Sequence, residues 1–219
     1  VVREWSSNWC SPHLYLIIKR TATAKAAPLV GVGRDYLYRL NSFSLDGQDL
    51  SVWRADQQEE SEIAELRIPL LGRHQVENAA TAYAVLQTVK QTGMRVELSA
   101  IRQGFSEVSW PGRFEILQRN PAVIVDSAHN RDSAQRLHSA VRDYFPDKSV
   151  ILVFGASEDK DINGILSELL PVTRQVILTR SFHPRAAHPQ DLLKITEMFH
   201  CPAIVEDTVE SALFQALRM

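Results

Sequence analysis

The sequence predicts an α/β protein in which a doubly wound, mostly parallel sheet follows a region of β-hairpins and helices. Short apolar runs rich in β-branched residues alternate with helical patterns from Phe114 to the C-terminus, the rhythm of βα units in a parallel sheet. Polar side chains follow three of these runs, at the edge where open α/β sheets bind ligands. The first half instead shows short alternating runs with turn residues. We therefore expect two domains, residues 1–108 and a Rossmann-like domain at residues 109–219.

The composition indicates an ordinary globular protein. Of the 219 residues, 45% are hydrophobic, and the formal net charge is −2, which gives no electrostatic footprint for nucleic acid or an anionic membrane. No apolar run approaches a membrane span of about 18 residues, and no secretory signal opens the chain. Cys10 and Cys201 lie far apart, which is typical of a reduced, cytoplasmic protein. Because the chain starts at Val1 rather than Met, we expect a fragment or a processed chain.

The first elements are short. The apolar run Leu14 to Lys19 fits a strand or a short buried helix, and Thr21 to Ala27 fits the end of a helix that Pro28 stops. Leu29 to Val32 is a strand candidate. The glycines of Gly31-Val-Gly33 lack the third glycine of a dinucleotide fingerprint, and the chain contains no G-x-x-x-x-G-K-[ST] phosphate loop.

A hairpin comes next. Residues Tyr36 to Arg54 alternate apolar and polar side chains around Asp46-Gly47, and Asp-Gly is a strong hairpin signal. The acidic run at residues 57–62 is typical of a solvated loop, and Ala64 to Pro69 fits a further strand.

Gly72 to Gln91 has the clearest helical pattern of the first half, and Gly93 fits its C-terminal cap. Asn78 is a poor helix former. An inward asparagine in the first turn would offer two donors and two acceptor lone pairs, the groups needed to recognise a purine edge. The plainer interpretation is a polar start to the helix.

A second, short helix is predicted from Leu98 to Phe105. The Trp110-Pro111-Gly112 turn then fits a domain boundary. Arg113 follows it. Such an arginine is usually a surface charge, although its planar fork can also clamp phosphate or ribose oxygens.

The stretch Pro121 to Val141 is the centre of the second half. Its apolar run, Ala122 to Val125, predicts a strand covered on both faces, as in a parallel sheet. Asp126, Ser127, His129 and Asn130 follow it directly, and then a helix begins that either Asn130 or Asp132 could cap. A helix N-terminus at a strand end favours an anion such as phosphate. Alternatively, Asp126 and Asn130 form only a turn and a cap.

The remaining pattern alternates strands and helices. We expect strands at Phe114–Leu117, Ser149–Phe154, Gln175–Thr179 and Ala203–Val205, and helices at Ile162–Leu170, Asp191–Phe199 and Val209–Leu217. Polar residues follow two of these strands: Ser157 and Lys160, then His183 and Arg185. This repetition predicts a shared site at one sheet edge. We predict no metal site at His183 and His188, because the prolines after them prevent a shared helical face.

Five motifs carry a family resemblance. In chain order they are LLGRHQVENAATA, WPGRFEIL, VDSAHNRDSA, VFGASEDKD and SFHPRAAHPQDL. Together they resemble the folylpolyglutamate synthase / dihydrofolate synthase family of the Mur ligase superfamily. The resemblance implies an ATP- and Mg²⁺-dependent ligase that phosphorylates the carboxylate of a folate or of dihydropteroate. The L-glutamate amine then attacks the acyl phosphate.

The resemblance also implies roles for single residues. Asn78 matches the asparagine that contacts adenine, and Arg113 matches an arginine that contacts the nucleotide. Asp126 matches the aspartate on the ribose side of ATP, and His129 matches a histidine lining the reaction centre. Lys160 resembles a charged position near the glutamate site, and we assign it to substrate binding together with Arg185.

The resemblance covers only part of such an enzyme. The family's phosphate loop, magnesium ligands and carbamylated lysine have no counterpart in the sequence, and a final strand is missing after Met219. We therefore expect residues 1–108 to be the end of a central ATP-binding domain whose N-terminal half is the partner of this chain. The ligase domain would follow. The chain alone should be an inactive monomer that binds neither nucleic acid nor membranes.

Two alternatives stay open. One is a Mur-type ligase that adds amino acids to cell-wall precursors, and the other is a non-catalytic nucleotide-binding module.

Overall fold

The computed structural model describes residues 12–56 and 63–219. The predicted loop at residues 57–62 and Cys10 lie outside this range. The chain divides into two compact units. The first contains the described residues up to Pro69 together with His74–Ser109, and the second contains Leu70–Arg73 together with Trp110–Met219. Within the described residues, no helix has the length and apolarity needed to cross a membrane.

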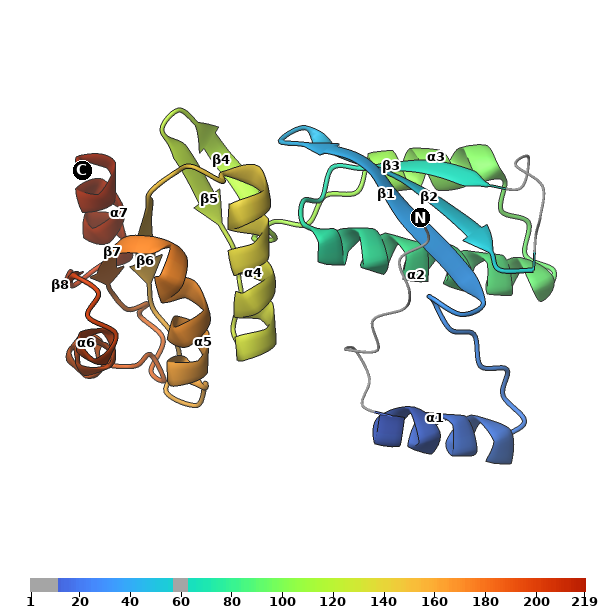
Figure 1. Cartoon of the computed structure of the whole chain (residues 1–219), viewed down its shortest axis with the longest axis horizontal. Coiled ribbons are helices and arrows are strands. Elements are labelled where there is room, and N and C mark those ends of the chain that lie inside the picture. Colours follow the sequence, from blue (N-terminus) through green and yellow to red (C-terminus); the bar gives the residue numbers. More distant parts are fainter. Residues whose placement is uncertain (1–11, 57–62) are drawn as a thin grey trace. The chain divides into compact units, whose positions relative to one another are not determined.

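The first unit is built on a three-stranded antiparallel sheet (Figure 1). Its strands are β1 (Tyr36–Ser44), β2 (Gly47–Arg54) and β3 (Ala64–Ile68), in that order. Ser44 pairs with Gly47, which confirms the Asp-Gly hairpin. The left-handed backbone of Gly47, with φ 134°, suits the only residue type without a Cβ. A Cβ there would lie 2.7 Å from the Ile68 carbonyl oxygen.

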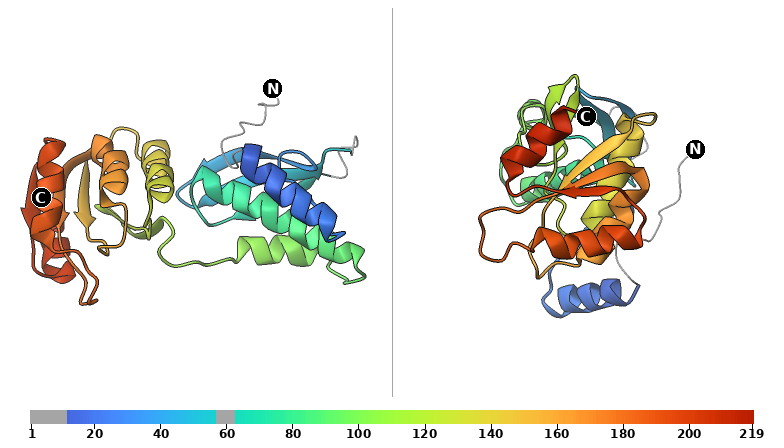
Figure 2. Two further views of the ribbon diagram at one scale, coloured as in Figure 1. Left: turned by 90° about the horizontal axis from the view of Figure 1, so that it is seen from below. Right: turned by 90° about the vertical axis from the view of Figure 1, so that its left-hand side faces the viewer.

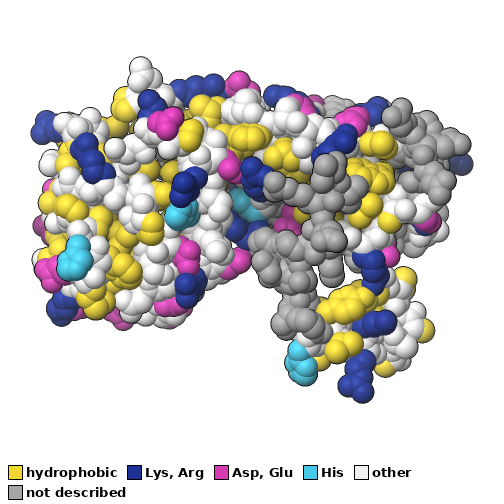
Figure 3. Space-filling view, viewed as in Figure 1, with side chains coloured by type: hydrophobic (Ala, Val, Ile, Leu, Met, Phe, Trp, Pro, Cys, Tyr) yellow, Lys and Arg dark blue, Asp and Glu magenta, His cyan; other side chains and the backbone are white. Residues whose placement is uncertain are grey.

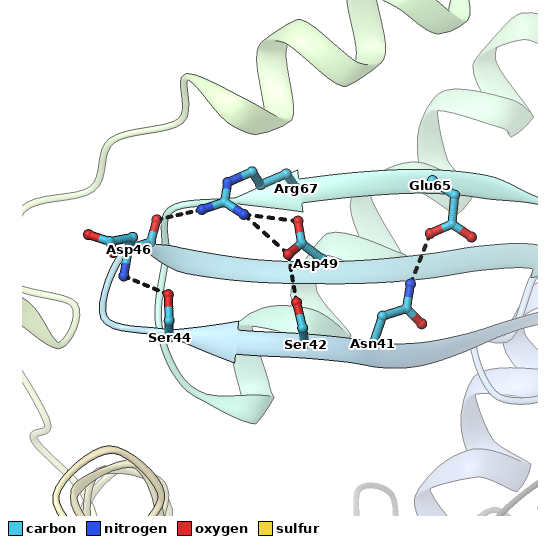
Figure 4. Close-up of polar contacts among 7 residues, drawn as sticks. All are labelled: Asn41, Ser42, Ser44, Asp46, Asp49, Glu65 and Arg67. Atoms are coloured by element: carbon cyan, nitrogen blue, oxygen red, sulfur yellow. Dashed lines mark hydrogen bonds and ion pairs between the residues drawn. The ribbon is translucent and has the colours of Figure 1, made fainter.

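Alternation along the strands decides which sheet face is buried. Leu50, Val52 and Leu66 are almost fully buried, whereas the residues between them face the other way. That second face is polar (Figure 4). Ser42 donates to Asp49 (2.7 Å), and Arg67 donates to Asp49 from the next strand (3.1 Å). Asn41 donates to Glu65 (2.9 Å), so hydrogen bonds cross all three strands.

The first unit also contains two helices, α2 (Arg73–Gln91) and α3 (Leu98–Ser106), and α3 packs against β3. Both helices were predicted from the sequence, and both are confirmed. The α2 ring of Tyr83 meets the β1 ring of Tyr36 edge-on, with centroids 6.2 Å apart. Gly93, with φ 98°, ends the first of these helices as expected.

The N-terminal helix α1 (Pro12–Ala24) confirms the helix end predicted from Thr21, although it stops at Ala24 rather than at Ala27. Leu14 to Lys19 is neither a strand nor a buried helix, because it joins Thr21 in one helix whose apolar side chains are largely exposed. Hydrophobic side chains are visible on its surface in Figure 3. The strand predicted at Leu29 to Val32 is also wrong. The Gly31 N–H donates to the Asp35 carboxylate (2.7 Å), so this segment turns instead of extending.

The second unit contains two sheets. The antiparallel hairpin consists of β4 (Glu115–Arg119) and β5 (Ala122–Val125). The parallel sheet consists of β6 (Val150–Phe154), β7 (Thr173–Leu178) and β8 (Ala203–Val205), in that order. The parallel sheet confirms the α/β class. The prediction for Ala122 to Val125 was wrong in its pairing: this strand joins its hairpin neighbour, and its end residues are exposed.

Helices lie on both faces of the parallel sheet (Figure 2). On one face, α5 (Ile162–Leu169) and α6 (Pro189–Met198) bury the cluster that includes Leu166, Leu192, Val176 and Leu178. Ile177 lies between Val176 and Leu178 in β7, so its side chain points to the opposite face. Helix α7 (Val209–Leu217) packs there. A short 3-10 helix, η2 (Leu170–Val172), follows α5. Helix α4 (Arg131–Tyr144) packs against α5.

Candidate functional site

The candidate site lies where β5 ends and α4 begins. The Asp126 carboxylate accepts two backbone hydrogen bonds there. The Phe114 N–H donates to its Oδ2 (2.8 Å), and the Ala128 N–H donates to its Oδ1 (2.8 Å). A third bond, from the Ser127 N–H to the Gly112 carbonyl (2.9 Å), joins the same two segments. The turn before β4 and the loop after β5 are therefore fixed together.

This joining brings Arg113 next to the loop that holds Asp126 and His129. Arg113 lies between the two anchored residues Gly112 and Phe114 and is half-buried. Among residues 12–56 and 63–219, no carboxylate forms an ion pair with its guanidinium. Its charge is available to an anion, whereas Arg131 on the following helix already pairs with Glu168 (2.8 Å).

His129 is exposed, and its ring is oriented by the backbone. Its Nδ1 lies 3.1 Å from the Ser127 carbonyl oxygen. A carbonyl oxygen only accepts, so Nδ1 carries the proton in the neutral ring and Nε2 is left with a free lone pair. This tautomer presents a proton acceptor at the surface of the second unit.

The helix start beneath these residues is tightly capped. Asn130 accepts from the Ser133 N–H (2.8 Å), and the Ser133 hydroxyl lies 3.1 Å from the Asn130 N–H. Asn130 is therefore the N-cap, and the alternative of Asp132 is wrong, because that side chain pairs with Arg136 (3.0 Å). The interpretation that Asp126 and Asn130 make a turn and a cap is thus correct as local structure. It leaves the second lone pairs of Asp126 free for a ligand.

Lys160 and Arg185 are brought together by a separate contact between loops. The Glu158 N–H donates to the Arg185 carbonyl and the Ala187 N–H donates to the Ala156 carbonyl, both at 2.9 Å. Lys160 lies 3.0 Å from Asp159. The hydrogen bond from Lys160 to the Asp159 carboxylate, with a smaller contribution from the positive charge of Arg185, holds the pKa of the Asp159 carboxyl below its ordinary value. The joined loops after β6 and β7 thus carry Lys160, Arg185 and the ionised carboxylate of Asp159.

Asn78 belongs to the first unit, and it does not have the inward, first-turn position that was considered for it. It lies in the second turn of α2 and is exposed. Val76, Ala80 and Tyr83 occupy the buried side of the helix, so Asn78 falls on the other side. Its side-chain Nδ2 donates to Gln75 Oε1 (3.1 Å), and its side-chain Oδ1 remains able to accept a hydrogen bond.

Two hollows lie away from these residues, on the first unit. One, of about 290 Å³, is lined by Arg34 and Arg54, among others, and the other, of about 590 Å³, by Arg67 and Arg102. None of the predicted site residues lines either hollow. Within the described part of the chain, no group of three or more His, Cys, Asp or Glu residues could hold a metal ion.

Two supporting residues were missed in the sequence. Glu115 accepts from the Gly112 N–H (2.7 Å) and closes the turn that carries Arg113. Ser133 completes the cap, and its position three residues after Asn130 is a known capping-box spacing that could have identified it. No local sequence pattern predicts the hydrogen bond of Glu115 to the Gly112 N–H, because this bond depends on the turn at Gly112 having formed.

Residues 112–219 match the family described as Mur ligase, glutamate ligase domain. The dihydrofolate synthase/folylpolyglutamate synthase of Bacillus subtilis is 27% identical over 188 residues, which are 85% of this chain and 43% of that protein.

Solved structures agree with this similarity. The folylpolyglutamate synthase of Mycobacterium tuberculosis complexed with ADP has a TM-score of 0.83 and 25% identity, over 95% of this chain and 46% of that chain. The bifunctional folylpolyglutamate synthase/dihydrofolate synthase of Yersinia pestis complexed with AMPPNP and Mn ion has a TM-score of 0.75 and 26% identity, over 92% of this chain and 44% of that chain. The chain thus spans less than half the length of these proteins.

Proposed function

Because residues 112–219 belong to the glutamate ligase domain family of the Mur ligases, and the chain's homologues are folylpolyglutamate and dihydrofolate synthases, we propose that it is part of such an enzyme. The reaction joins L-glutamate to the γ-carboxyl of a folate, to dihydropteroate, or to both. Residues 109–219 would be the ligase domain, and residues 1–108 would be the end of the central ATP-binding domain.

One observation supports this function most: Arg113, the immobilised carboxylate of Asp126 and the imidazole of His129 lie on two segments that backbone hydrogen bonds join before α4. Arg113 would bind phosphate oxygens of the nucleotide, for which its fork is suited. Asp126 is held by two N–H groups and would accept hydrogen bonds from ribose hydroxyls without having to reorganise. Asn78 of the first unit would contact the adenine edge.

The chemistry proceeds in two steps. The substrate carboxylate attacks the γ-phosphorus of ATP, which gives an acyl phosphate and ADP. The glutamate amine then attacks the acyl carbon, phosphate leaves, and the amine nitrogen loses a proton as the amide forms. His129 Nε2, whose lone pair is free in the tautomer with Nδ1 protonated, would accept that proton. Lys160 and Arg185 would hold the carboxylates of the incoming glutamate.

Some of this apparatus would come from elsewhere in the enzyme. The nucleotide phosphates need a divalent ion. We infer that Mg²⁺ is bound mainly by the part of the enzyme that corresponds to the regions of the relatives not matched by this chain. We also propose that the enzyme is cytoplasmic, since ATP is its reactant, and that it is a monomer.

Kinetics of the enzyme that carries this chain test the proposal. ADP release should require both L-glutamate and a folate or dihydropteroate. Arg113→Ala should raise the KM for ATP about tenfold or more, the loss of a charge-assisted hydrogen bond, whereas Arg119→Ala on the same hairpin should not. His129→Gln should lower kcat about a hundredfold, as for a lost general base.

Two outcomes would favour the alternatives instead. ADP release that depends on a cell-wall precursor rather than a folate would indicate a Mur-type enzyme. Nucleotide binding without turnover for any of these acceptors would indicate a non-catalytic module.

A further inference from the structure

Phe114 has a backbone conformation that a bulky side chain seldom adopts. Its φ is 45°, in the left-handed region, and its side chain is only 2% exposed. For a non-glycine residue of this size such a φ is an outlier. It persists only when the surroundings fix it, and such residues gather near functional sites.

The surroundings that fix Phe114 are aromatic. Its ring packs against Tyr144, with centroids 5.6 Å apart, and against Phe145, with centroids 6.5 Å apart. Both partners stand at the end of α4. Tyr144 is itself anchored, because its hydroxyl oxygen accepts from the Gly72 N–H (3.3 Å). The ring of Phe114 is therefore held against the C-terminal end of α4.

The backbone of the same residue faces the site. The Phe114 N–H donates to Asp126 Oδ2, and the preceding residue is Arg113. If the φ of Phe114 relaxed to a negative value, the N–H would turn away from the carboxylate and the Arg113 side chain would be redirected. The ring thus determines where both polar groups point.

We infer that Phe114 is a positioning residue: its ring, clamped by Tyr144 and Phe145, holds the backbone that orients Arg113 and Asp126 toward a nucleotide. The nucleotide part of this inference rests on the proposed function. The competing interpretation is that Phe114 only fills the core.

A pair of matched substitutions separates the two interpretations. Phe114→Leu and Phe154→Leu both remove a buried ring from the second unit, where Phe154 is 7% exposed and belongs to the core of the parallel sheet. Only Phe114 has the left-handed backbone and the bond to Asp126. Global stability is measured by urea unfolding, and local opening by amide hydrogen exchange of residues 112–114 and 126–128 in the 219-residue chain.

We expect Phe114→Leu to speed exchange of these amides about tenfold beyond any change in global stability, as expected for a lost hydrogen bond to a charged group. Phe154→Leu should change exchange only in step with global stability. Equal effects of the two substitutions, once corrected for stability, would overturn the inference. Should Phe114→Leu fail to fold, Phe145→Leu loses one clamping ring and carries the same test.

A double substitution tests whether Phe114 acts through Asp126. Asp126→Ala removes the acceptor, so adding Phe114→Leu to it should speed exchange at residues 112–114 no further. Additive effects would contradict a role through this bond.

Nucleotide affinity provides the functional measurement. In the enzyme that carries this chain, Phe114→Leu should weaken ADP binding about tenfold, and Phe154→Leu should not. Unchanged ADP affinity in Phe114→Leu would overturn the positioning role. If the wild-type enzyme fails to bind ADP, the proposed function is what fails, and the exchange comparison then decides the role of Phe114.

Discussion

Replacing Asp126 by asparagine should destabilise the second unit, although the side chain keeps its shape. The carboxylate has two oxygens, and each accepts one backbone N–H at 2.8 Å. An amide has one oxygen and one NH2 group, so whichever way it turns, one N–H faces another donor. Phe114 is buried, so its N–H would have little access to water.

The magnitude follows from that geometry. Leaving one buried donor unsatisfied costs about 1–3 kcal/mol, and the remaining bond also loses its charge assistance. We expect Asp126→Asn to lower the free energy of unfolding by about 2 kcal/mol. The assay is urea unfolding of the 219-residue chain followed by circular dichroism.

Asp132→Asn is the matched control. Asp132 is exposed, and its ion pair among the described residues is the i,i+4 contact with Arg136, so its loss should cost about 0.3–0.5 kcal/mol. If Asp126→Asn were no more destabilising than Asp132→Asn, the two hydrogen bonds would not fix the carboxylate. The proposed role of Asp126 as an immobilised hydrogen-bond acceptor would then be wrong.

Three further predictions concern stability and activity. Thr179→Val should leave the chain as stable or make it more stable, because within the described part of the chain the buried Thr179 hydroxyl has no hydrogen-bond partner. Thermal unfolding measures this stability, and a large decrease in the unfolding temperature would show that the hydroxyl has a partner. The Ser42 hydroxyl and then Arg67 hold the pKa of Asp49 below its ordinary value of 3.8. Asp49 therefore stabilises the first unit above that pH, and this contribution is lost as the pH falls through the lowered pKa. Urea unfolding between pH 5 and pH 2 should show a shallower acid loss in Asp49→Asn, and an identical slope would contradict the assignment. The 219-residue chain alone should show no glutamate-dependent ADP release, because the nucleotide's phosphates and divalent ion would be held by the rest of the enzyme; measurable turnover would disprove that division of roles.

The second half of the chain was the more predictable. Its strands and helices are short, uninterrupted patterns between turn residues, and the predicted ranges of β8 and α7 agree with the structure to the residue. The capping residue Asn130 was one of two candidates in the sequence, since a side chain's capping ability is local. The five motifs identified the family, because a resemblance sums information from many positions at once.

The failures share a physical cause, which is that pairing and exposure depend on distant residues. Ala122 to Val125 has the composition of a central strand, yet its pairing with β4 left it half-exposed. Leu14 to Lys19 is apolar enough for a buried element, but it became part of an exposed helix. The left-handed backbone of Phe114 has no signal in its own residue type, because packing against Tyr144 and Phe145 selects it.

The central claim is that the turn carrying Arg113 and the loop carrying Asp126 and His129 together face a bound nucleotide. Hydrogen exchange of the enzyme that carries this chain, measured with and without saturating ADP, tests it most directly. The account predicts that ADP slows exchange in residues 112–114 and 126–130 and leaves α7 unchanged. Bound ADP that protects neither segment would contradict it.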